Sequence, residues 1–435
     1  MSKNSIIILA AGLGTRMKSS TPKVLHSISG HPMLFHILWQ AEILSDDIHI
    51  VLYHEHEKIK EALKPNFSNL HFHIQDFKNY PGTGGALMGV NPKYEDILIL
   101  SGDMPLVTAS SLEPLLSLNY SISMSAFEAK DPTGYGRVIV DDKNFVSRIV
   151  EEKDANEDEK RVSLVNAGIY AFKKDFLNKY LPNLNNNNAQ GEYYLTDLIG
   201  IATKENLPIN AVLVDEKTFM GVNSKAHLAK AETYMQEDIK TKWMEKGVLM
   251  RLSETIFIDA LASFEGECEV GNGVSIVGKT TIKNSQIKTN SVVESSIIEN
   301  SSVGPLARIR PGCNILNSHI GNFVEVKNSN LNGVKAGHLS YLGDSNIQSG
   351  TNVGCGTITC NYDGKSKHIT NIGKNVFIGS GTQIVAPIKI EDDVIIGAGS
   401  TITKDIPKNA LALTRAPLRI VNGFFSKFFN KEDLK

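Results

Sequence analysis

The C-terminal part of the chain carries an apolar residue at every sixth position. Two runs keep this spacing without a slip: Ile258, Phe264, Val270, Ile276 and Ile282, and then Ile372, Ile378, Ile384, Ile390, Ile396 and Ile402. Between them the period loosens, with some steps of five, through Ile287, Val292, Ile297, Val303, Ile309 and Ile315. An α-helix cannot use a period of six, because this spacing scatters the apolar residues around its cylinder. A chain that turns a corner every six residues points each of them inward, so the pattern predicts a parallel β-helix of hexapeptide repeats.

The first half of the chain shows a different pattern. Continuous apolar runs at Ile6–Leu9, Ile48–Tyr53 and Ile97–Leu100 are typical of buried parallel strands. Stretches predicted to be helical, Met33–Leu44 and Glu55–Leu63, lie between them. This alternation predicts an open, Rossmann-like α/β sheet that binds its ligand at the carboxyl ends of the strands.

A single helix is expected to join the two parts. Asn223 or Ser224 can serve as its N-cap, and Gly247 as its C-terminal stop. One apolar face follows at steps of three and four, made of Leu228, Ala231, Met235, Ile239 and Lys242/Trp243. We therefore expect a first domain over residues 1–223, a linker helix over 224–247 and a β-helix domain with a C-terminal tail over 248–435.

Composition narrows the class of protein. The 435 residues carry 45 Lys and Arg against 47 Asp and Glu, a net charge of −2 that argues against a protein that coats nucleic acid. No apolar run approaches the roughly 18 residues of a membrane span, and the run at Ile6–Leu9 is too short for a signal peptide. The four cysteines lack the C-x-x-C spacing of a zinc site and imply no disulfide framework. We expect a cytoplasmic protein with no membrane insertion.

The first strand runs into a glycine-rich turn with two cations beside it. Ala10-Ala11-Gly12-Leu13-Gly14-Thr15-Arg16 follows Leu9, and Lys23 comes soon after. Small residues after a strand let the backbone approach a phosphate, and Arg16 and Lys23 suit a triphosphate. The turn is not a P-loop, because no Gly-Lys-Ser/Thr follows. Asp103, just after the strand Ile97–Leu100, is either a metal ligand at the carboxyl edge of the sheet or a turn-capping residue.

Taken together, these residues resemble the signature of sugar-nucleotide pyrophosphorylases, a class of nucleotidyltransferases. Further stretches that carry the resemblance are Pro81–Ala86, Gly102–Leu106, Thr133–Arg137, Val165–Gly168, Gly191–Asp197 and Gly221–Asn223. Joined to the β-helix, nearly the whole chain is similar to the bifunctional N-acetylglucosamine-1-phosphate uridylyltransferase/glucosamine-1-phosphate N-acetyltransferase family. The resemblance implies a left-handed β-helix and the synthesis of UDP-N-acetylglucosamine, a precursor of peptidoglycan and lipopolysaccharide.

The resemblance assigns a uridylyl site to the first domain. It implies that Asp103 and Asn223 hold Mg²⁺, that Arg16 and Lys23 neutralise phosphate charge, and that Gln75, Gly82 and Thr83 meet the uracil. Gly136, Glu151 and Asn166 are expected to hold the sugar, and the rest of the Glu151–Asp154 stretch is expected to be a solvated loop. The remaining contacts implied for UTP or the UDP-sugar are Leu9, Ala10, Ala11, Gly12, Ser101 and Gly102.

A second constellation lies on the predicted β-helix. The stretch Lys335–Asp344, with His338 inside it, is expected to interrupt the hexapeptide rhythm, as functional loops do in solenoids. A lone histidine is more often structural, but acetylation of an amino sugar needs a base near neutral pH. The resemblance places this base on His338, the sugar-phosphate grip on Arg310 and Lys327, and sugar contacts on Tyr341 and Asn352.

For acetyl-CoA the resemblance implies contacts from Cys355, Asn361, Tyr362, Ser380, Ala398 and Arg415. Ordinary turn chemistry would equally explain Asn361-Tyr362-Asp363-Gly364. Cys355 departs from the alanine usual in the family and is either a packing residue or a tolerated variant. The tail after Arg415 is short and ends in the aromatic segment 424–429, which we expect to pack on the solenoid or on a neighbouring subunit.

The family also implies a homotrimer with acetyl sites between subunits, and small molecules as the substrates.

One alternative is a monofunctional pyrophosphorylase whose β-helix is structural or regulatory. The loop with His338 and the Asn361–Tyr362 pair count against it. Another is a binding module with degenerate sites, against which the retention of Arg16, Lys23, Asp103 and Asn223 counts.

Overall fold

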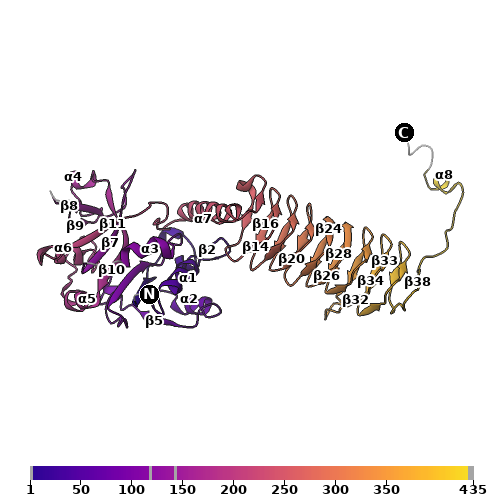
Figure 1. Ribbon diagram of the computed structural model, residues 1–435, viewed down its shortest axis with the longest axis horizontal. Coiled ribbons are helices and arrows are strands. Elements are labelled where there is room, and N and C mark those ends of the chain that lie inside the picture. The colour runs from indigo at the N-terminus through magenta and orange to yellow at the C-terminus, as the bar shows by residue number, and fades with distance from the viewer. Residues whose placement is uncertain (1–2, 117–119, 142–144, 430–435) are drawn as a thin grey trace. The chain divides into compact units, whose positions relative to one another are not determined.

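A computed structural model describes residues 3–116, 120–141 and 145–429 (Figure 1). The chain divides into two compact units, Met1–Asp238 and Ile239–Lys435, here called the N-terminal and the C-terminal unit. Among the described residues, no helix is both long enough and apolar enough to cross a lipid bilayer.

A mixed sheet forms the centre of the N-terminal unit, with strand order β11-β7-β10-β6-β1-β4-β5. Four neighbouring strands are parallel: β6 (Asp96–Ser101), β1 (Asn4–Leu9), β4 (Asp47–Leu52) and β5 (Leu70–Ile74). Next to them, β10 (Leu164–Lys173) is antiparallel to β6 and to β7 (Ile122–Glu128), and β11 (Ile209–Leu213) closes that edge parallel to β7. A hairpin of β8 (Arg137–Val140) and β9 (Val146–Val150) pairs with β10.

The helices of this unit are α1 (Met33–Leu44), α2 (His56–Leu63), α3 (Ala109–Leu116), α4 (Glu157–Lys160), α5 (Lys174–Tyr180) and α6 (Asp197–Lys204). Short 3₁₀ turns lie at Thr15–Met17, Lys23–Leu25, Gly85–Leu87 and Leu181–Asn183, and a small hairpin joins β2 (Ser27–Ile28) to β3 (His31–Pro32). The three predicted strands and the predicted Met33–Leu44 helix are confirmed. The second helix begins at His56 rather than at Glu55, because Glu55 has a φ of +56°, outside the helical region.

The expected linker helix is α7 (Lys225–Glu245). Its N-cap is Ser224, whose hydroxyl accepts the amide of His227 at 3.2 Å. Gly247 follows with a φ of +96°, as expected of a residue that stops a helix. The predicted face is buried at Ala231 and Met235. The two compact units divide within this helix.

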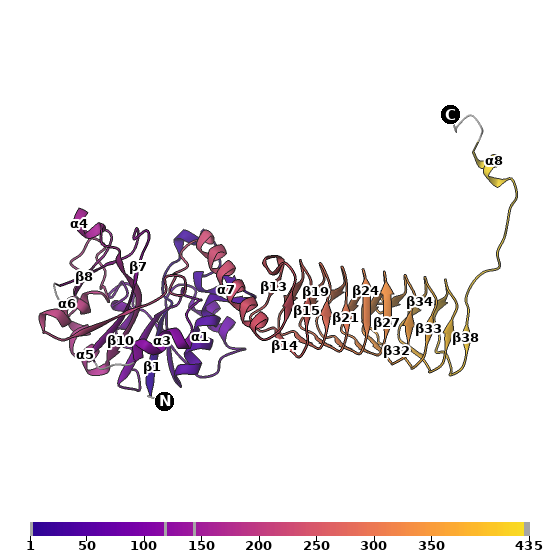
Figure 2. The ribbon, with the colours of Figure 1, turned by 45° about the horizontal axis from the view of Figure 1, so that its top comes forward.

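The C-terminal unit is a parallel β-helix whose three sheets are formed by every third strand (Figure 2). The first sheet contains β12 (Leu249–Met250), β15 (Glu269–Val270), β18 (Gln286–Ile287), β21 (Ser302–Val303), β24 (His319–Asn322), β27 (Lys335–His338), β30 (Asn352–Val353), β33 (Phe377–Ile378), β36 (Ile395–Ile396) and β38 (Leu411–Ala412). The second contains β13 (Phe257–Ile258), β16 (Ser275–Val277), β19 (Val292–Glu294), β22 (Arg308–Ile309), β25 (Glu325–Lys327), β28 (Tyr341–Gly343), β31 (Ile358–Cys360), β34 (Gln383–Val385) and β37 (Thr401–Ile402). The third contains β14 (Ser263–Glu265), β17 (Thr281–Lys283), β20 (Ile297–Glu299), β23 (Asn314–Leu316), β26 (Asn330–Asn332), β29 (Ser345–Ile347), β32 (Thr370–Ile372) and β35 (Ile388–Ile390).

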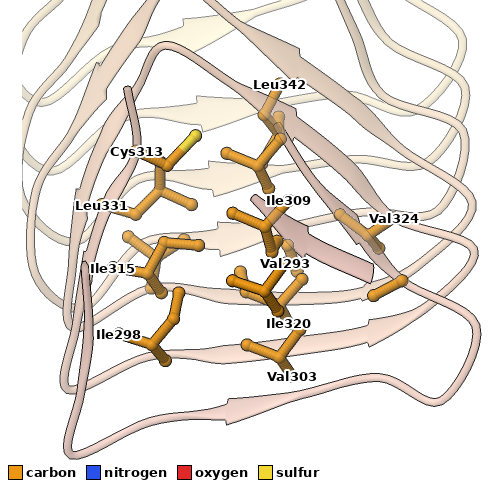
Figure 3. Close-up of a cluster of buried hydrophobic side chains, with 14 of the residues drawn as sticks. Val293, Ile298, Val303, Ile309, Cys313, Ile315, Ile320, Val324, Leu331 and Leu342 are labelled. Carbon is orange, nitrogen blue, oxygen red and sulfur yellow. The ribbon is translucent and has the colours of Figure 1, made fainter. Parts of the chain in front are cut away.

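Nearly all the expected aliphatic positions point into this β-helix and stack in columns (Figure 3). Two expectations are wrong. Val292 and Ile297 face outward, and their neighbours Val293 and Ile298 are the buried residues. The inward positions step by six from Ile287 to Val293 and then by five to Ile298 and Val303. A step of five taken one coil side too early therefore reaches the opposite face of the strand.

The stretch Lys335–Asp344 does not interrupt the coil, contrary to expectation. It forms the regular strands β27 and β28, and Ala336 and Leu342 are buried six positions apart. The coil is instead enlarged between β31 and β32, where residues 361–369 form a loop. Within this loop the Asp363 carboxylate accepts the amides of Lys365 and Ser366 at 2.8 Å and 2.7 Å. Asn361–Gly364 is therefore part of a loop, as its residue types suggested.

The C-terminal tail does not pack on the solenoid of its own chain. Residues 413–429 are exposed throughout, including helix α8 (Phe424–Phe428). Its aromatic rings contact one another, with ring centroids 5.7 Å apart for Phe424 and Phe428.

Candidate active sites

The glycine turn after β1 brings two lengths of chain close together. Gly14 has a φ of +62°, and a Cβ atom there would lie 2.7 Å from the Cβ of Lys23. Glycine at this position therefore lets Lys23 approach the turn. The Gly102 amide donates to the Leu9 carbonyl at 2.8 Å, which ties the end of β6 to the end of β1.

Five side chains from three distant parts of the sequence meet at these strand ends. The Lys23 ammonium contacts the Asp103 carboxylate and donates to the Asn223 amide oxygen at 2.7 Å. Arg16 donates to the same Asn223 oxygen at 2.8 Å, and the Ser101 hydroxyl donates to Asp103 at 2.7 Å. The amide of Val222 donates to the Asp103 carbonyl at 2.8 Å, and this bond fixes Asn223 beside Asp103. The sequence-based hypothesis that these residues share one site agrees with this geometry.

The arrangement fits a divalent cation. An ammonium lies between a carboxylate and an amide oxygen, so this position already favours a positive charge. In the described part of the chain, no group of three or more His, Cys, Asp or Glu side chains could hold a metal ion. Mg²⁺ typically takes only one or two protein oxygens and completes its shell with water and substrate phosphates. Asp103 and Asn223 fit that donor set.

The residues expected to meet the uracil form another wall. Gln75 is buried, and its side-chain amide donates to the carbonyls of Tyr80 at 2.9 Å and Gly82 at 3.0 Å. The Thr83 hydroxyl accepts the amide of Leu195 at 3.1 Å. Backbone and side chain therefore hold each other in one geometry, as a rigid recognition surface requires.

Acidic and amide groups line a further part of the site. The Glu151 carboxylate accepts the Thr196 hydroxyl at 3.2 Å, and the Asn166 side chain donates to the Tyr170 hydroxyl at 2.5 Å. Burial raises the pKa of Glu151, and the nearby carboxylates, among them Glu192, add to the rise while the Thr196 hydrogen bond opposes it.

These walls enclose a cavity of about 550 Å³. The expected residues that line it are Leu9, Ala10, Ala11, Gly12, Arg16, Lys23, Gln75, Gly82, Thr83, Ser101, Asp103, Glu151, Asn166 and Asn223. Gly102 and Gly136 are absent from its lining but adjoin residues that line it, since Gly102 bonds to Leu9 and a Cβ on Gly136 would lie 3.5 Å from the Glu151 carboxylate.

The cavity has further lining residues to which the sequence analysis gave no individual role. Some lie in the glycine turn or in the quoted motifs, namely Leu13, Gly14, Thr15, Ala86, Met104, Gly168, Glu192, Leu195 and Thr196, and the others are Val24, Phe77 and Tyr170. Glu192, Leu195 and Thr196 belong to the Gly191–Asp197 motif, so the motif was the available signal. Phe77 and Tyr170 carry no comparable sequence signal, because only the fold brings them to the cavity.

On the β-helix, His338 and three of the expected acetyl-CoA contacts follow strands of the same sheet. His338 is exposed at the end of β27, in register with Asn322. Backbone hydrogen bonds connect the corners of successive coils, from Gly381 to Cys355 at 2.7 Å and from Gly399 to Ser380 at 2.8 Å. Cys355, Ser380 and Ala398 therefore follow one another along a single edge, here called the His338 edge. Arg415 reaches its far end, since a Cβ on Gly397 would lie 3.5 Å from the Arg415 guanidinium.

The expected acceptor-sugar contacts gather mainly around β25 and β28. Arg310 forms an ion pair with Glu325 at 3.0 Å, and the Lys327 ammonium lies 3.9 Å from the Asp344 carboxylate. Asp344 also accepts the side chain of Asn361, so it is a further candidate that the sequence analysis did not single out. Its position in the quoted Lys335–Asp344 stretch was the available signal.

Two residues expected to contact the substrates lie apart from the residues around β25 and β28. Asn352 lies on β30, paired with Lys335 and Phe377. Tyr362 lies in the enlarged loop and is largely exposed.

Residues 152–154 form a turn in which Lys153 and Asp154 are exposed, as expected of a solvated loop. Glu152 is partly exposed and also forms an ion pair with the buried Arg137 at 2.5 Å, a contact that the sequence analysis did not anticipate.

Comparison with known families agrees with both halves of the molecule. Residues 6–142 match the MobA-like NTP transferase domain, and residues 369–404 match the bacterial transferase hexapeptide, with six repeats. The molecule is thus a transferase that combines a nucleotidyltransferase domain with a left-handed parallel β-helix of hexapeptide repeats.

Relatives of known name match nearly the whole chain. Bifunctional protein GlmU of Nitratiruptor sp. is 58% identical over 98% of this chain and 99% of its own length. The proteins of that name from Aliarcobacter butzleri and from Campylobacter jejuni are 57% and 53% identical, each over 99% of this chain and 100% of its own length. The chain therefore belongs to the GlmU family of bifunctional proteins. This membership confirms the expectation of a bifunctional enzyme with uridylyltransferase and acetyltransferase activity.

Proposed function

We propose that the enzyme acetylates glucosamine-1-phosphate at the His338 edge and uridylates N-acetylglucosamine-1-phosphate in the cavity of the N-terminal unit. The observation that carries the second assignment is the meeting of Lys23, Arg16, Asp103 and Asn223 at the carboxyl ends of β1 and β6. In open α/β sheets, ligands bind at this edge.

In the uridylyl reaction an oxygen of the sugar phosphate attacks the α-phosphorus of UTP, and pyrophosphate leaves. The attacking oxygen is already anionic, so no covalent nucleophile on the protein is needed. Arg16 and Lys23 neutralise charge on the phosphates, and the glycine turn offers backbone amides to them. Asp103 and Asn223 would hold Mg²⁺, which when bound supplies further charge neutralisation. Gln75, Gly82 and Thr83 orient the base.

In the acetyl reaction the amine of glucosamine-1-phosphate attacks the thioester carbon of acetyl-CoA. His338 accepts a proton from the attacking amine, a C–N bond forms, the C–S bond breaks, and the proton can then pass to the departing thiolate. His338 is exposed and stands on the same edge as Cys355, Ser380 and Ala398, which supports this assignment. Arg310 and Lys327 supply the cations that suit the sugar phosphate.

We propose a homotrimer with acetyl sites shared between subunits. The last coils of the β-helix expose Phe377, Ile395 and Leu411 on one sheet, and the aromatic tail is exposed as well. Apolar surfaces of this kind favour contact with another copy of the chain. The domain bounds 1–223, 224–247 and 248–435 and the cytoplasmic location stay predictions.

A paired assay tests both assignments. One measurement follows pyrophosphate release from UTP, Mg²⁺ and N-acetylglucosamine-1-phosphate, and the other follows CoA release from acetyl-CoA and glucosamine-1-phosphate. Asp103→Ala is expected to abolish the first activity and spare the second, and His338→Ala is expected to do the reverse. If wild type never releases CoA, the β-helix is a scaffold. Near-normal uridylyl transfer by Asp103→Ala would contradict the metal assignment.

A further inference from the structure

A buried arginine lies beside the residues of the N-terminal unit that are proposed to bind the sugar. Arg137 begins β8, and only 2% of its side chain is exposed. Its guanidinium pairs with Glu152 at 2.5 Å, donates to the Tyr135 carbonyl and lies 3.4 Å from the Lys160 carbonyl. A buried charge is costly unless it is paired, so this contact is a strong constraint on the backbone around it.

The ion pair adjoins three residues proposed to hold the sugar. Gly136 precedes Arg137, and Glu151 precedes Glu152. The Asn166 amide donates to the Gly136 carbonyl at 2.8 Å, and a Cβ on Gly136 would lie 3.5 Å from the Glu151 carboxylate. Three segments that are distant in sequence therefore meet at the Arg137–Glu152 pair.

The carboxylate of Glu152 is bound from two sides. Besides Arg137, the Gly134 amide donates to it at 3.3 Å, within the turn that precedes β8. The hydrogen bond from Arg137 is the main cause of a lowered pKa for Glu152. Glu152 is thus an anion held in one place, although it is one of a run of charged residues.

We propose that the Arg137–Glu152 pair is a positioning device for the sugar half of the uridylyl site. It holds Gly136, Glu151 and Asn166 at the spacing that the sugar phosphate requires, and neither member of the pair touches the sugar. This inference rests on the proposed function. The part of the site proposed for UTP is built from other segments, the turn after β1 for the phosphates and residues 75–83 for the uracil, so the pair acts on one substrate and not on the other.

The neighbouring elements offer a matched control pair. Arg148 on β9 and Glu159 in α4 also form an ion pair at 2.5 Å, but 55% of the Arg148 side chain is exposed. Glu159 also accepts the Asn156 amide as part of a helix capping box. Glutamine can serve at that capping position, so Glu159→Gln removes a charge while it keeps the local structure.

The test uses the full chain with Glu152→Gln, Arg137→Lys and Glu159→Gln. For Glu152→Gln we expect the KM for N-acetylglucosamine-1-phosphate to rise about 10-fold, because small displacements of positioning groups are that damaging. The KM for UTP and kcat should stay within about twofold, the pattern of lost ground-state binding. Arg137→Lys keeps the positive charge but loses the planar guanidinium that can donate two parallel hydrogen bonds. It should therefore raise the KM for N-acetylglucosamine-1-phosphate by less than Glu152→Gln does. Glu159→Gln should change none of these values.

Two results would overturn the inference. One is an unchanged KM for the sugar phosphate in Glu152→Gln. The other is an equal rise in both KM values together with a fall in Tm, which would indicate a general structural role. If wild type itself fails to release pyrophosphate from these substrates, the proposed function fails, and the inference falls with it.

Discussion

A methyl group added at Gly82 should strain the backbone of the N-terminal unit and also disturb the residues proposed to bind the uracil. The φ of Gly82 is +92°, and a Cβ atom there would lie 2.7 Å from the Tyr193 carbonyl and 2.8 Å from the Glu192 Cβ. A left-handed backbone conformation costs a residue with a side chain about 1–2 kcal/mol. The two contacts are too short for any real Cβ, so the chain must also shift, at about 1–3 kcal/mol. Gly82→Ala should therefore lower the free energy of unfolding of the N-terminal unit by roughly 2–5 kcal/mol.

The same backbone shift should also weaken the binding of UTP. The Gly82 carbonyl accepts the Gln75 side chain at 3.0 Å, and the Gly84 amide donates to the Tyr193 carbonyl at 2.8 Å. Both bonds depend on the backbone that the new methyl group displaces. We expect the KM for UTP to rise about 10-fold in the pyrophosphate-release assay.

Gly89→Ala is the control. Gly89 also has a positive φ, +81°, but a Cβ atom there would meet nothing within 4 Å. For Gly89→Ala, the free energy of unfolding should fall only by the cost of the left-handed backbone conformation, about 1–2 kcal/mol, and the KM for UTP should not change. The comparison uses denaturant unfolding and the KM for UTP for both variants. If Gly82→Ala is no less stable than Gly89→Ala and binds UTP normally, the steric argument is refuted.

The remaining predictions concern packing, pH and thiol chemistry. Ile298→Ala should destabilise the β-helix by about 2–5 kcal/mol in denaturant unfolding, whereas exposed Ile297→Ala should change it by less than about 0.5 kcal/mol; equal losses would contradict the inward register. Burial lowers the pKa of His49, although the adjacent Asp47 opposes this, so the fold favours the neutral imidazole. The stability that depends on it is complete above about pH 6.5 and is lost as the pH falls below that value, and His49→Asn should reduce the fall in Tm between about pH 7.5 and about pH 5.5. Cys355 is exposed, and acetyl-CoA should slow its alkylation by iodoacetamide; an unchanged rate would argue against its place at the acetyl-CoA site.

Periodicity and motifs were sufficient for the architecture. Apolar residues spaced six apart can all be buried by a coil that has one inward residue on each side, so the β-helix could be inferred before any contact was known. The strand–glycine-turn pattern likewise predicted the edge of the sheet where Lys23 and Asp103 meet. Local patterns of this kind are readable because neighbours in sequence are neighbours in space.

Register and long-range partners were beyond such reasoning. Val292 and Ile297 were misplaced because coil sides vary between five and six residues, and a slip of one turns a side chain to the other face of its strand. Nothing local marks Glu152 as the partner of Arg137, or Asp344 as the acceptor for Asn361. The amino-acid order determines which segments can form strands, turns and helices, but only packing of the whole chain decides which distant polar groups are brought together, because a buried charge selects its partner from whatever the fold places beside it.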